Sequence, residues 1–183
     1  MDPALIVFIV IGIIVFITFS WWVKTGNRLK RLDIKVSEAL SGIEVALTKR
    51  YDMLTKMLDV AKGYKQHESE MFTEVIKLRK GMSVSELQGE AVKLDKLASS
   101  ISVVAEAYPE LRSSEVFVEL QAGIRDAEEH LQAARRLYNA TVTALNTTIV
   151  VFPSSIVANA QNAQSREFFE AEEAKRSDVE MKF

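Results

Sequence analysis

The sequence predicts an all-α protein: an N-terminal single transmembrane helix followed by an elongated antiparallel helical bundle of three long helices plus a short C-terminal helix or tail. Three observations lead to this prediction. Residues 4–23 form an apolar stretch without charge. Apolar residues recur at helical spacing through most of the remaining chain, and no segment alternates with the period of two that is typical of strands.

The apolar stretch at residues 4–23 contains no charged side chain, although 26% of the whole chain is charged. As a helix that rises about 1.5 Å per residue, it covers the roughly 30 Å of a bilayer's hydrocarbon core. Trp21 and Trp22 at its end match the aromatic belt of a membrane interface. The competing interpretation is a cleavable signal peptide, which needs a basic segment first and a small-residue cleavage site. Neither is present, so we expect a retained anchor.

Basic residues follow the anchor and none precedes it. By the positive-inside rule, this predicts a single-pass protein of the inner (cytoplasmic) membrane, with residues 1–3 outside and the bundle in the cytoplasm. The basic cluster either contacts anionic lipid headgroups or only sets this topology. The predicted membrane-interface residues are Trp21, Trp22, Lys24, Arg28, Lys30 and Arg31.

The bundle, residues 24–165, is predicted to begin with one long helix over about 27–80. Apolar residues recur there at steps of three and four from Leu29 onward, which keeps them on one helical face. The pattern slips at Gly63, where the helix either kinks or runs through. Gly26-Asn27, just before this helix, is a candidate hinge or N-cap.

Turn and cap residues separate this helix from a second one. Gly81 is a candidate for the left-handed conformation at the end of the first helix. Ser83 and Glu86 have the spacing of a capping box, which predicts a helix start. The second helix is expected to close at Tyr108-Pro109, because the residue before a proline disfavours helical geometry.

The third predicted helix begins after Ser113 or Ser114 and ends against Pro153. It has the clearest periodicity of the chain, a heptad seam of the coiled-coil type with one four-residue irregularity. We expect Phe117 and Phe152 to plug the two ends of this seam.

The end of the chain is less regular. Residues 154–165 are small and amide-rich, and they predict a short helix or an ordered loop. Residues 166–183 are predicted to form a charged tail that docks by the aromatic pair Phe168-Phe169 before fraying.

Composition excludes several classes of function. The chain has no cysteine, so it has no disulfide framework, no thiolate nucleophile and no zinc site of the usual thiolate kind. Its 23 basic and 25 acidic residues nearly balance, which argues against nucleic-acid binding. Its glycines are scattered singly, and a phosphate-binding loop requires them clustered.

His67 and His130 are the two histidines. Each has acidic neighbours, but neither stands in a metal-ligand or catalytic-triad pattern. On a charged helix face such clusters are mostly solvated surface. We therefore expect no enzyme, no metal and no cofactor. A catalytic role would require the two imidazoles to converge with carboxylates in the fold.

Other residues are candidates for interaction or for helix register. Arginines beside tyrosines either clamp an anionic ligand or, more commonly, bury their stems and form ion pairs. Asn139 and Asn146 are one heptad apart beside the seam, and we favour a polar flank over register-fixing amides in a bundle or oligomer. The residues of this class are Arg50, Tyr51, Tyr64, His67, Arg135, Arg136, Tyr138, Asn139 and Asn146.

Several short segments match a family pattern in order and spacing. They are Lys49-Arg50-Tyr51-Asp52 with Leu54, Val60-Ala61-Lys62-Gly63-Tyr64 with His67-Glu68, Tyr108-Pro109-Glu110-Leu111, Ala134-Arg135-Arg136-Leu137-Tyr138-Asn139, Asn146, Phe152-Pro153-Ser154 and Phe168-Phe169-Glu170. With the N-terminal anchor, they make the chain resemble the LemA family over nearly its whole length. The resemblance implies a membrane-anchored, elongated bacterial helical bundle without established enzymatic activity or cofactor. One departure is the stretch 159–164, Asn-Ala-Gln-Asn-Ala-Gln, where the family usually has a Gly-Phe-containing segment.

Together these features predict a membrane-anchored, non-enzymatic scaffold or interaction platform. Its expected partners are membrane lipid and further copies of itself, with no nucleic acid. A homo-oligomer is expected because tethering chains in one plane and one orientation raises their effective concentration. The alternative is a membrane-tethered sensor or adaptor whose bundle binds an unidentified cytoplasmic protein or an anionic ligand.

Overall fold

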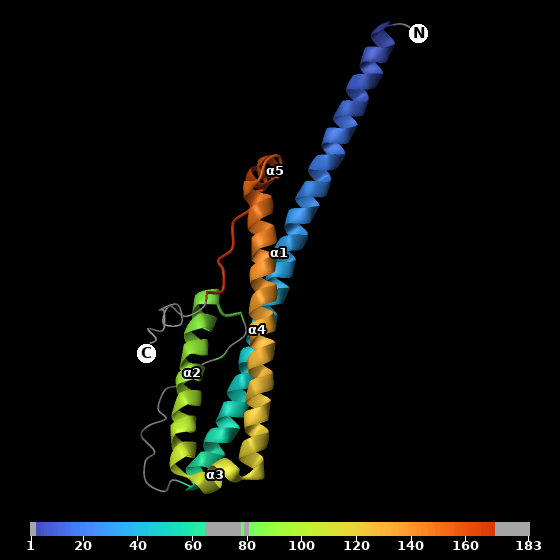
Figure 1. Ribbon diagram of the computed structural model, residues 1–183. Coiled ribbons are helices and arrows are strands. Elements are labelled where there is room, and N and C mark those ends of the chain that lie inside the picture. The colour runs from blue at the N-terminus through green and yellow to red at the C-terminus, as the bar shows by residue number, and fades with distance from the viewer. Residues whose placement is uncertain (1–2, 65–77, 79–80, 171–183) are drawn as a thin grey trace, which may run out of the picture. The chain divides into compact units, whose positions relative to one another are not determined.

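A computed structural model describes residues 3–64, 78 and 81–170. These residues form helices and no strand, which confirms the all-α fold with a long apolar N-terminal helix and a bundle of further helices. The helices are α1 (Pro3–Tyr64), α2 (Val84–Ala107), α3 (Pro109–Ser113), α4 (Glu115–Val150) and α5 (Ser154–Ala160) (Figure 1). The chain divides into two compact units, which we call unit 1 (Met1–Glu38 with Ala140–Glu167) and unit 2 (Ala39–Asn139 with Phe168–Phe183).

In unit 1, α1 continues without a break through Gly26 and Asn27, so the hinge or N-cap expected there is wrong. Gly26 is buried beside the residue that follows α5. A Cβ built on Gly26 would lie 2.3 Å from the amide nitrogen of Gln161. The contacting atom is the end of a flexible, exposed side chain, so Gly26 lies beside the segment after α5 within a continuous helix and makes no turn.

The core of unit 1 is small and comes from three helices. α4 ends at Val150, before Pro153, as the sequence predicts. The amide-rich stretch then forms α5 over its first seven residues and is irregular from Gln161 onward. The buried apolar residues of this unit are Leu29 and Val36 on α1, Val142 and Leu145 on α4, and Val157 and Ala158 on α5.

Unit 2 is a bundle of the second part of α1, α2 and the first part of α4. α4 is antiparallel to α1, since Lys49 pairs with Asp126 while Gly123 lies against Met53. The largest fully buried side chains of this unit are Ile43, Leu47 and Leu54 on α1, Leu87, Leu94 and Ile101 on α2, Leu111 on α3, and Phe117, Leu131 and Tyr138 on α4.

The direction of α2 differs from the antiparallel arrangement that the sequence predicts. The start of α2 lies beside the beginning of the α1 part of unit 2. There the Glu44 carboxylate accepts a hydrogen bond at 3.0 Å from the N–H of Gly81, just before α2. Further along both helices, Arg50 pairs with Asp95. α2 is therefore parallel to α1. This is possible because residues 65–83 separate the two helices, a length sufficient to return along a helix of the bundle.

Helix ends follow local signals where these exist. Ser83 and Glu86 form the predicted capping box, and Gly81 has the left-handed conformation with φ 79°. Of the helix expected over 27–80, residues 27–64 belong to α1, Leu78 is not helical, and the others up to 80 lie outside the described residues.

The predicted end plugs divide into one that is buried and one that is not. Phe117 is fully buried, whereas Phe152 is 75% exposed, so its expected role as a plug is wrong. α4 ends two residues before Phe152, and the side chain therefore leaves the face that the heptad pattern assigns to it. In the tail, Phe169 is buried and Phe168 is exposed, so one ring of the aromatic pair docks; residues 171–183 lie outside the described range.

Candidate membrane interface and polar contacts

The first part of α1 is long and apolar enough to cross a membrane, which is consistent with membrane anchoring. Every residue from 4 to 19 is exposed, and burial within the chain begins at Ser20 and Trp21. Trp22 is 38% exposed. Within the part of the chain that the structure describes, these apolar side chains therefore pack into no protein core, which is the situation of lipid-facing residues.

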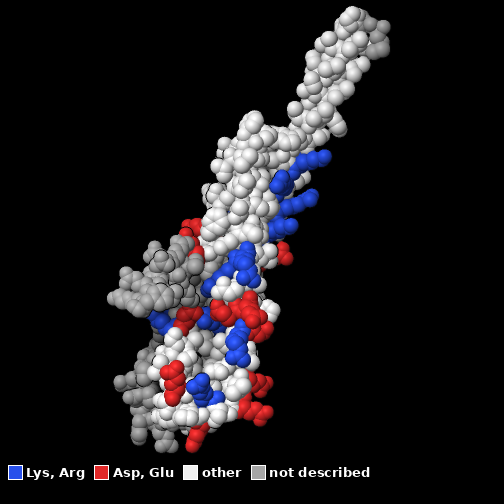
Figure 2. Space-filling view, viewed as in Figure 1, with Lys and Arg blue, Asp and Glu red and all other residues white. Residues whose placement is uncertain are grey.

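The basic residues after this stretch lie on different faces of α1. Figure 2 shows Lys and Arg side chains gathered along α1 just beyond its uncharged part. One face forms a shallow surface cavity of about 440 Å³ that is lined by Lys24, Asn27, Arg28, Arg31, Leu32 and Lys35. Lys30 lines a different cavity, so the predicted interface residues do not form a single cluster.

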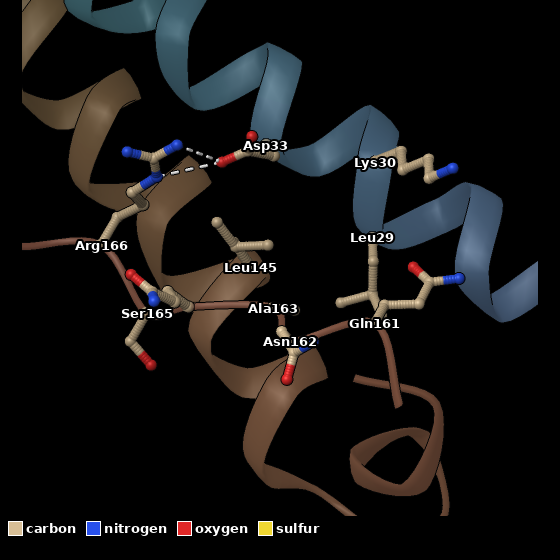
Figure 3. A pocket seen from close by; sticks show the side chains of 10 residues that line it. Leu29, Lys30, Asp33, Leu145, Gln161, Asn162, Ala163, Ser165 and Arg166 are labelled. Carbon is tan, nitrogen blue, oxygen red and sulfur yellow. Dashed lines mark hydrogen bonds and ion pairs between the residues drawn. The ribbon is translucent and has the colours of Figure 1, made fainter. Parts of the chain in front are cut away.

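The cavity beside Lys30 also belongs to unit 1 and measures about 380 Å³. Figure 3 shows how α1, α4 and the segment after α5 enclose it. Its lining consists of Leu29, Lys30, Asp33, Leu145 and residues 161–166. The Arg166 guanidinium donates two hydrogen bonds to Asp33 Oδ1, at 2.7 and 3.0 Å. The remaining lining residues supply the Lys30 ammonium, side-chain amides, the Ser165 hydroxyl and alkyl groups, which suit hydrogen bonding to a polar group.

The two asparagines singled out by their heptad spacing each hold the backbone of the C-terminal segment. In unit 1, Asn146 Nδ2 donates to the Arg166 carbonyl and Asn146 Oδ1 accepts from the Arg166 N–H, both at 2.9 Å. In unit 2, Asn139 makes the same pair of bonds with Phe169, at 2.9 and 2.8 Å. Both flank the seam, as predicted, but the sequence did not indicate these backbone partners.

Arg50 is the buried charged centre of unit 2, with only 6% of its surface exposed. Its Nη2 lies 2.5 Å from Asp95 Oδ1 on α2, and its Nε lies 3.2 Å from Glu128 Oε2 on α4. The second contact is an ion pair by distance but lacks hydrogen-bond angles, and Nη1 has no hydrogen bond within the described residues. Arg50 thus links three helices electrostatically, as a buried cation requires.

A second charged group lies on the surface of unit 2. A hydrogen bond from Lys49 lowers the pKa of the Asp126 carboxyl; desolvation opposes this by raising the pKa, and the charges of Lys49 and His130 lower it further. His130 Nε2 is 3.4 Å from Asp126 Oδ1. This pairing is complete above the ordinary pKa of aspartate and is lost as the pH falls through the lowered value.

The other predicted interaction residues are spread along unit 2. The Arg135 guanidinium lies over the Phe169 ring, 4.9 Å from its centre. Tyr138 is buried, Tyr51 is half-buried and Arg136 is exposed. The Tyr64 side chain and all of His67 lie outside the described residues, and the convergence of the two imidazoles that a catalytic role would require falls outside them as well. Within the described ranges, no group of three or more acidic or histidine side chains could hold a metal ion.

Comparison with known proteins gives one family. The LemA family model matches residues 39–183. Protein LemA of Metamycoplasma hominis is 27% identical over 175 residues, which cover 93% of this chain and 78% of the relative. The match to the family model begins at residue 39, the first residue of unit 2. The alignment with the relative covers 93% of this chain, so it must include part of the apolar stretch.

Replacing Arg50 tests its structural role. We expect Arg50→Met to lower the free energy of unfolding by about 1–3 kcal/mol, because it leaves two carboxylates without their buried partner. Urea unfolding of the full chain in detergent, followed by circular dichroism, measures this. Arg136→Met removes an exposed arginine of the same unit and should change little. Equal effects of the two variants would contradict the assignment.

Replacing the two asparagines tests the backbone contacts. Asn139→Ala should raise the exchange rate of the Phe169 amide hydrogen about tenfold, the effect of losing roughly 1.4 kcal/mol of hydrogen bonding. Asn146→Ala should do the same for Arg166. Hydrogen exchange read by mass spectrometry follows both segments. Asn159→Ala, at an exposed position of α5, is the control, and unchanged exchange in both Asn139→Ala and Asn146→Ala would refute these roles.

Proposed function

The chain belongs to the LemA family, and on that premise we propose that it is a non-enzymatic, membrane-anchored platform that self-associates. In this proposal α1 holds the protein in the inner (cytoplasmic) membrane with the bundle in the cytoplasm, in agreement with the basic residues that follow the span. Family membership by itself specifies no function. The support comes from how the chain uses its helices and its polar residues.

The main support is that the anchor helix is also a core helix. α1 continues past the apolar stretch, and Leu29 and Val36 on the same helix are buried in unit 1. A continuous helix keeps a fixed direction between the span and unit 1, whereas a flexible linker does not. Copies in one membrane therefore meet in a common orientation, which raises the effective concentration of any complementary surfaces.

The polar residues support a structural rather than a ligand-binding use. Arg50 pairs with two carboxylates, Arg135 lies over an aromatic ring, and Asn139 binds backbone. All three side chains thus have partners within unit 2. This favours the platform over the alternative of a sensor that binds an anionic ligand through these arginines and tyrosines.

The absence of cysteine makes self-association directly testable. Single cysteines can be placed at exposed apolar positions of unit 2 and treated with a thiol cross-linker in isolated native membranes. We expect cross-linked dimers for at least one position, because a contact between copies must bring some surface residues together. The positions are Val45, Val103, Val116, Val118 and Leu137, each about half exposed or more.

The control for cross-linking is Leu94→Cys, whose side chain is fully buried. It should give no dimer. Mass measurement of the cysteine-free chain in native-membrane discs should give more than one chain per particle. Self-association would be refuted if no exposed cysteine gave a cross-linked dimer and the particles had the mass of a single chain.

Orientation is tested with one of the same variants. Val103→Cys should react with a membrane-impermeant maleimide in inverted membrane vesicles and not in intact spheroplasts, because the positive-inside rule puts unit 2 in the cytoplasm. Leu94→Cys again controls for accessibility. Labelling of Val103→Cys in intact spheroplasts would reverse the proposed topology.

A further inference from the structure

The junction of α4 and α5 carries apolar side chains that unit 1 does not cover. Phe152 is 75% exposed, and its neighbours are exposed as well. We call the four residues the α4–α5 tip: Val150 at 72%, Val151 at 52%, Phe152 at 75% and Ile156 at 50% exposure. Single exposed apolar residues are ordinary, but four within seven consecutive residues favour a binding surface.

The tip lies within a long stretch without charge. Residues 137–165 contain no acidic, basic or histidine side chain. α4 and α5 taken together are apolar enough to pass as a membrane-crossing segment, although they are bent by 91°. Figure 2 shows uncharged surface over the end of α4 and α5, continuing onto the apolar part of α1. A partner for this surface is therefore expected to be apolar.

Contacts inside unit 1 place the tip at the level of the membrane interface. Gln161, directly after α5, lies against Gly26. Gly26 is four residues past Trp22, about 6 Å along the helix. Because α5 is bent by 91° from α4, it lies across the end of α4, and the tip and Gln161 are at similar heights. Figure 1 shows α5 beside α1, where the free part of α1 begins.

We propose that the α4–α5 tip inserts into the interfacial layer of the bilayer that α1 crosses. Its apolar side chains enter the boundary between headgroups and acyl chains, as those of monotopic helices do. The exposed side chains of Lys24, Arg28 and Arg31 lie beside anionic headgroups at the same interface. A second span is not implied, because Val142, Leu145 and Thr148 of α4 are buried in unit 1.

This contact would fix the rotation of the protein about the axis of α1, which a single span does not do. One transmembrane helix leaves a protein free to rotate about the helix axis. A second contact, displaced from that axis, determines which side of unit 1 faces the bilayer. The proposal adds a lipid-binding surface to the anchor and does not depend on self-association.

Fluorescence quenching by lipids with brominated acyl chains tests the proposal in the full chain. Trp21→Phe and Trp22→Phe remove the two native tryptophans. Phe152→Trp then reports on the tip, and Val151→Trp replaces it if circular dichroism shows that the first variant is not folded. In vesicles we expect a blue-shifted emission that loses intensity when the acyl chains are brominated.

The matched control is Ile34→Trp in the same background. Ile34 is 67% exposed and belongs to α1 of the same unit. It lies twelve residues past Trp22, about 18 Å along the helix and beyond the reach of acyl-chain bromines. We expect its emission to be unchanged by bromination.

Two results would overturn the proposal. One is equal quenching at the tip and at Ile34, or none at the tip. The other is a blue-shifted tip emission that bromination leaves unchanged, because this would show that protein covers the tip. Either outcome leaves the cross-linking test of self-association independent, since that test reports on unit 2.

Discussion

The backbone inside a bilayer can satisfy its hydrogen bonds only within regular structure, so residues 4–23 must be helical. In this chain the same helix continues to Tyr64 without a break. Its side chains therefore fall into two groups in succession: exposed apolar residues over 4–19, as suits a membrane span, and residues that pack on protein from Ser20 and Trp21 onward. The packing of α4 and α5 in unit 1 and of α2 and α4 in unit 2 depends on the faces that this one helix presents.

The C-terminal segment is held in a different way from the helices. Helices pack by buried apolar residues, whereas residues 166 and 169 are held by paired hydrogen bonds from asparagine side chains. An amide provides both a donor and an acceptor and can therefore imitate a neighbouring strand. Phe169 adds a buried ring under the Arg135 guanidinium. A segment without secondary structure of its own is thus ordered by a few specific contacts.

The sequence predicts well the features that depend on nearby residues. The apolar stretch, the capping box at Ser83 and the limits of α4 follow from local pattern and were found. The direction of α2 depends on contacts such as Glu44 with Gly81, which no local periodicity contains. The asparagine contacts join residues 20 and 30 positions apart, and Gly26 lies against Gln161, which is distant in the sequence. Phe152 fits the heptad pattern, but the helix ends before it.

The composition of unit 1 also has a consequence for biosynthesis. This unit combines the first residues of the chain with residues 140–167. During translation the N-terminal helix can enter the membrane long before the ribosome has made the segment that packs on it. Leu29 and Val36 then stay uncovered until Val142 and Leu145 have been synthesised. Such pairing of distant segments slows folding and exposes apolar surface meanwhile. The core of unit 1 is therefore incomplete until residues 140–158 have been made.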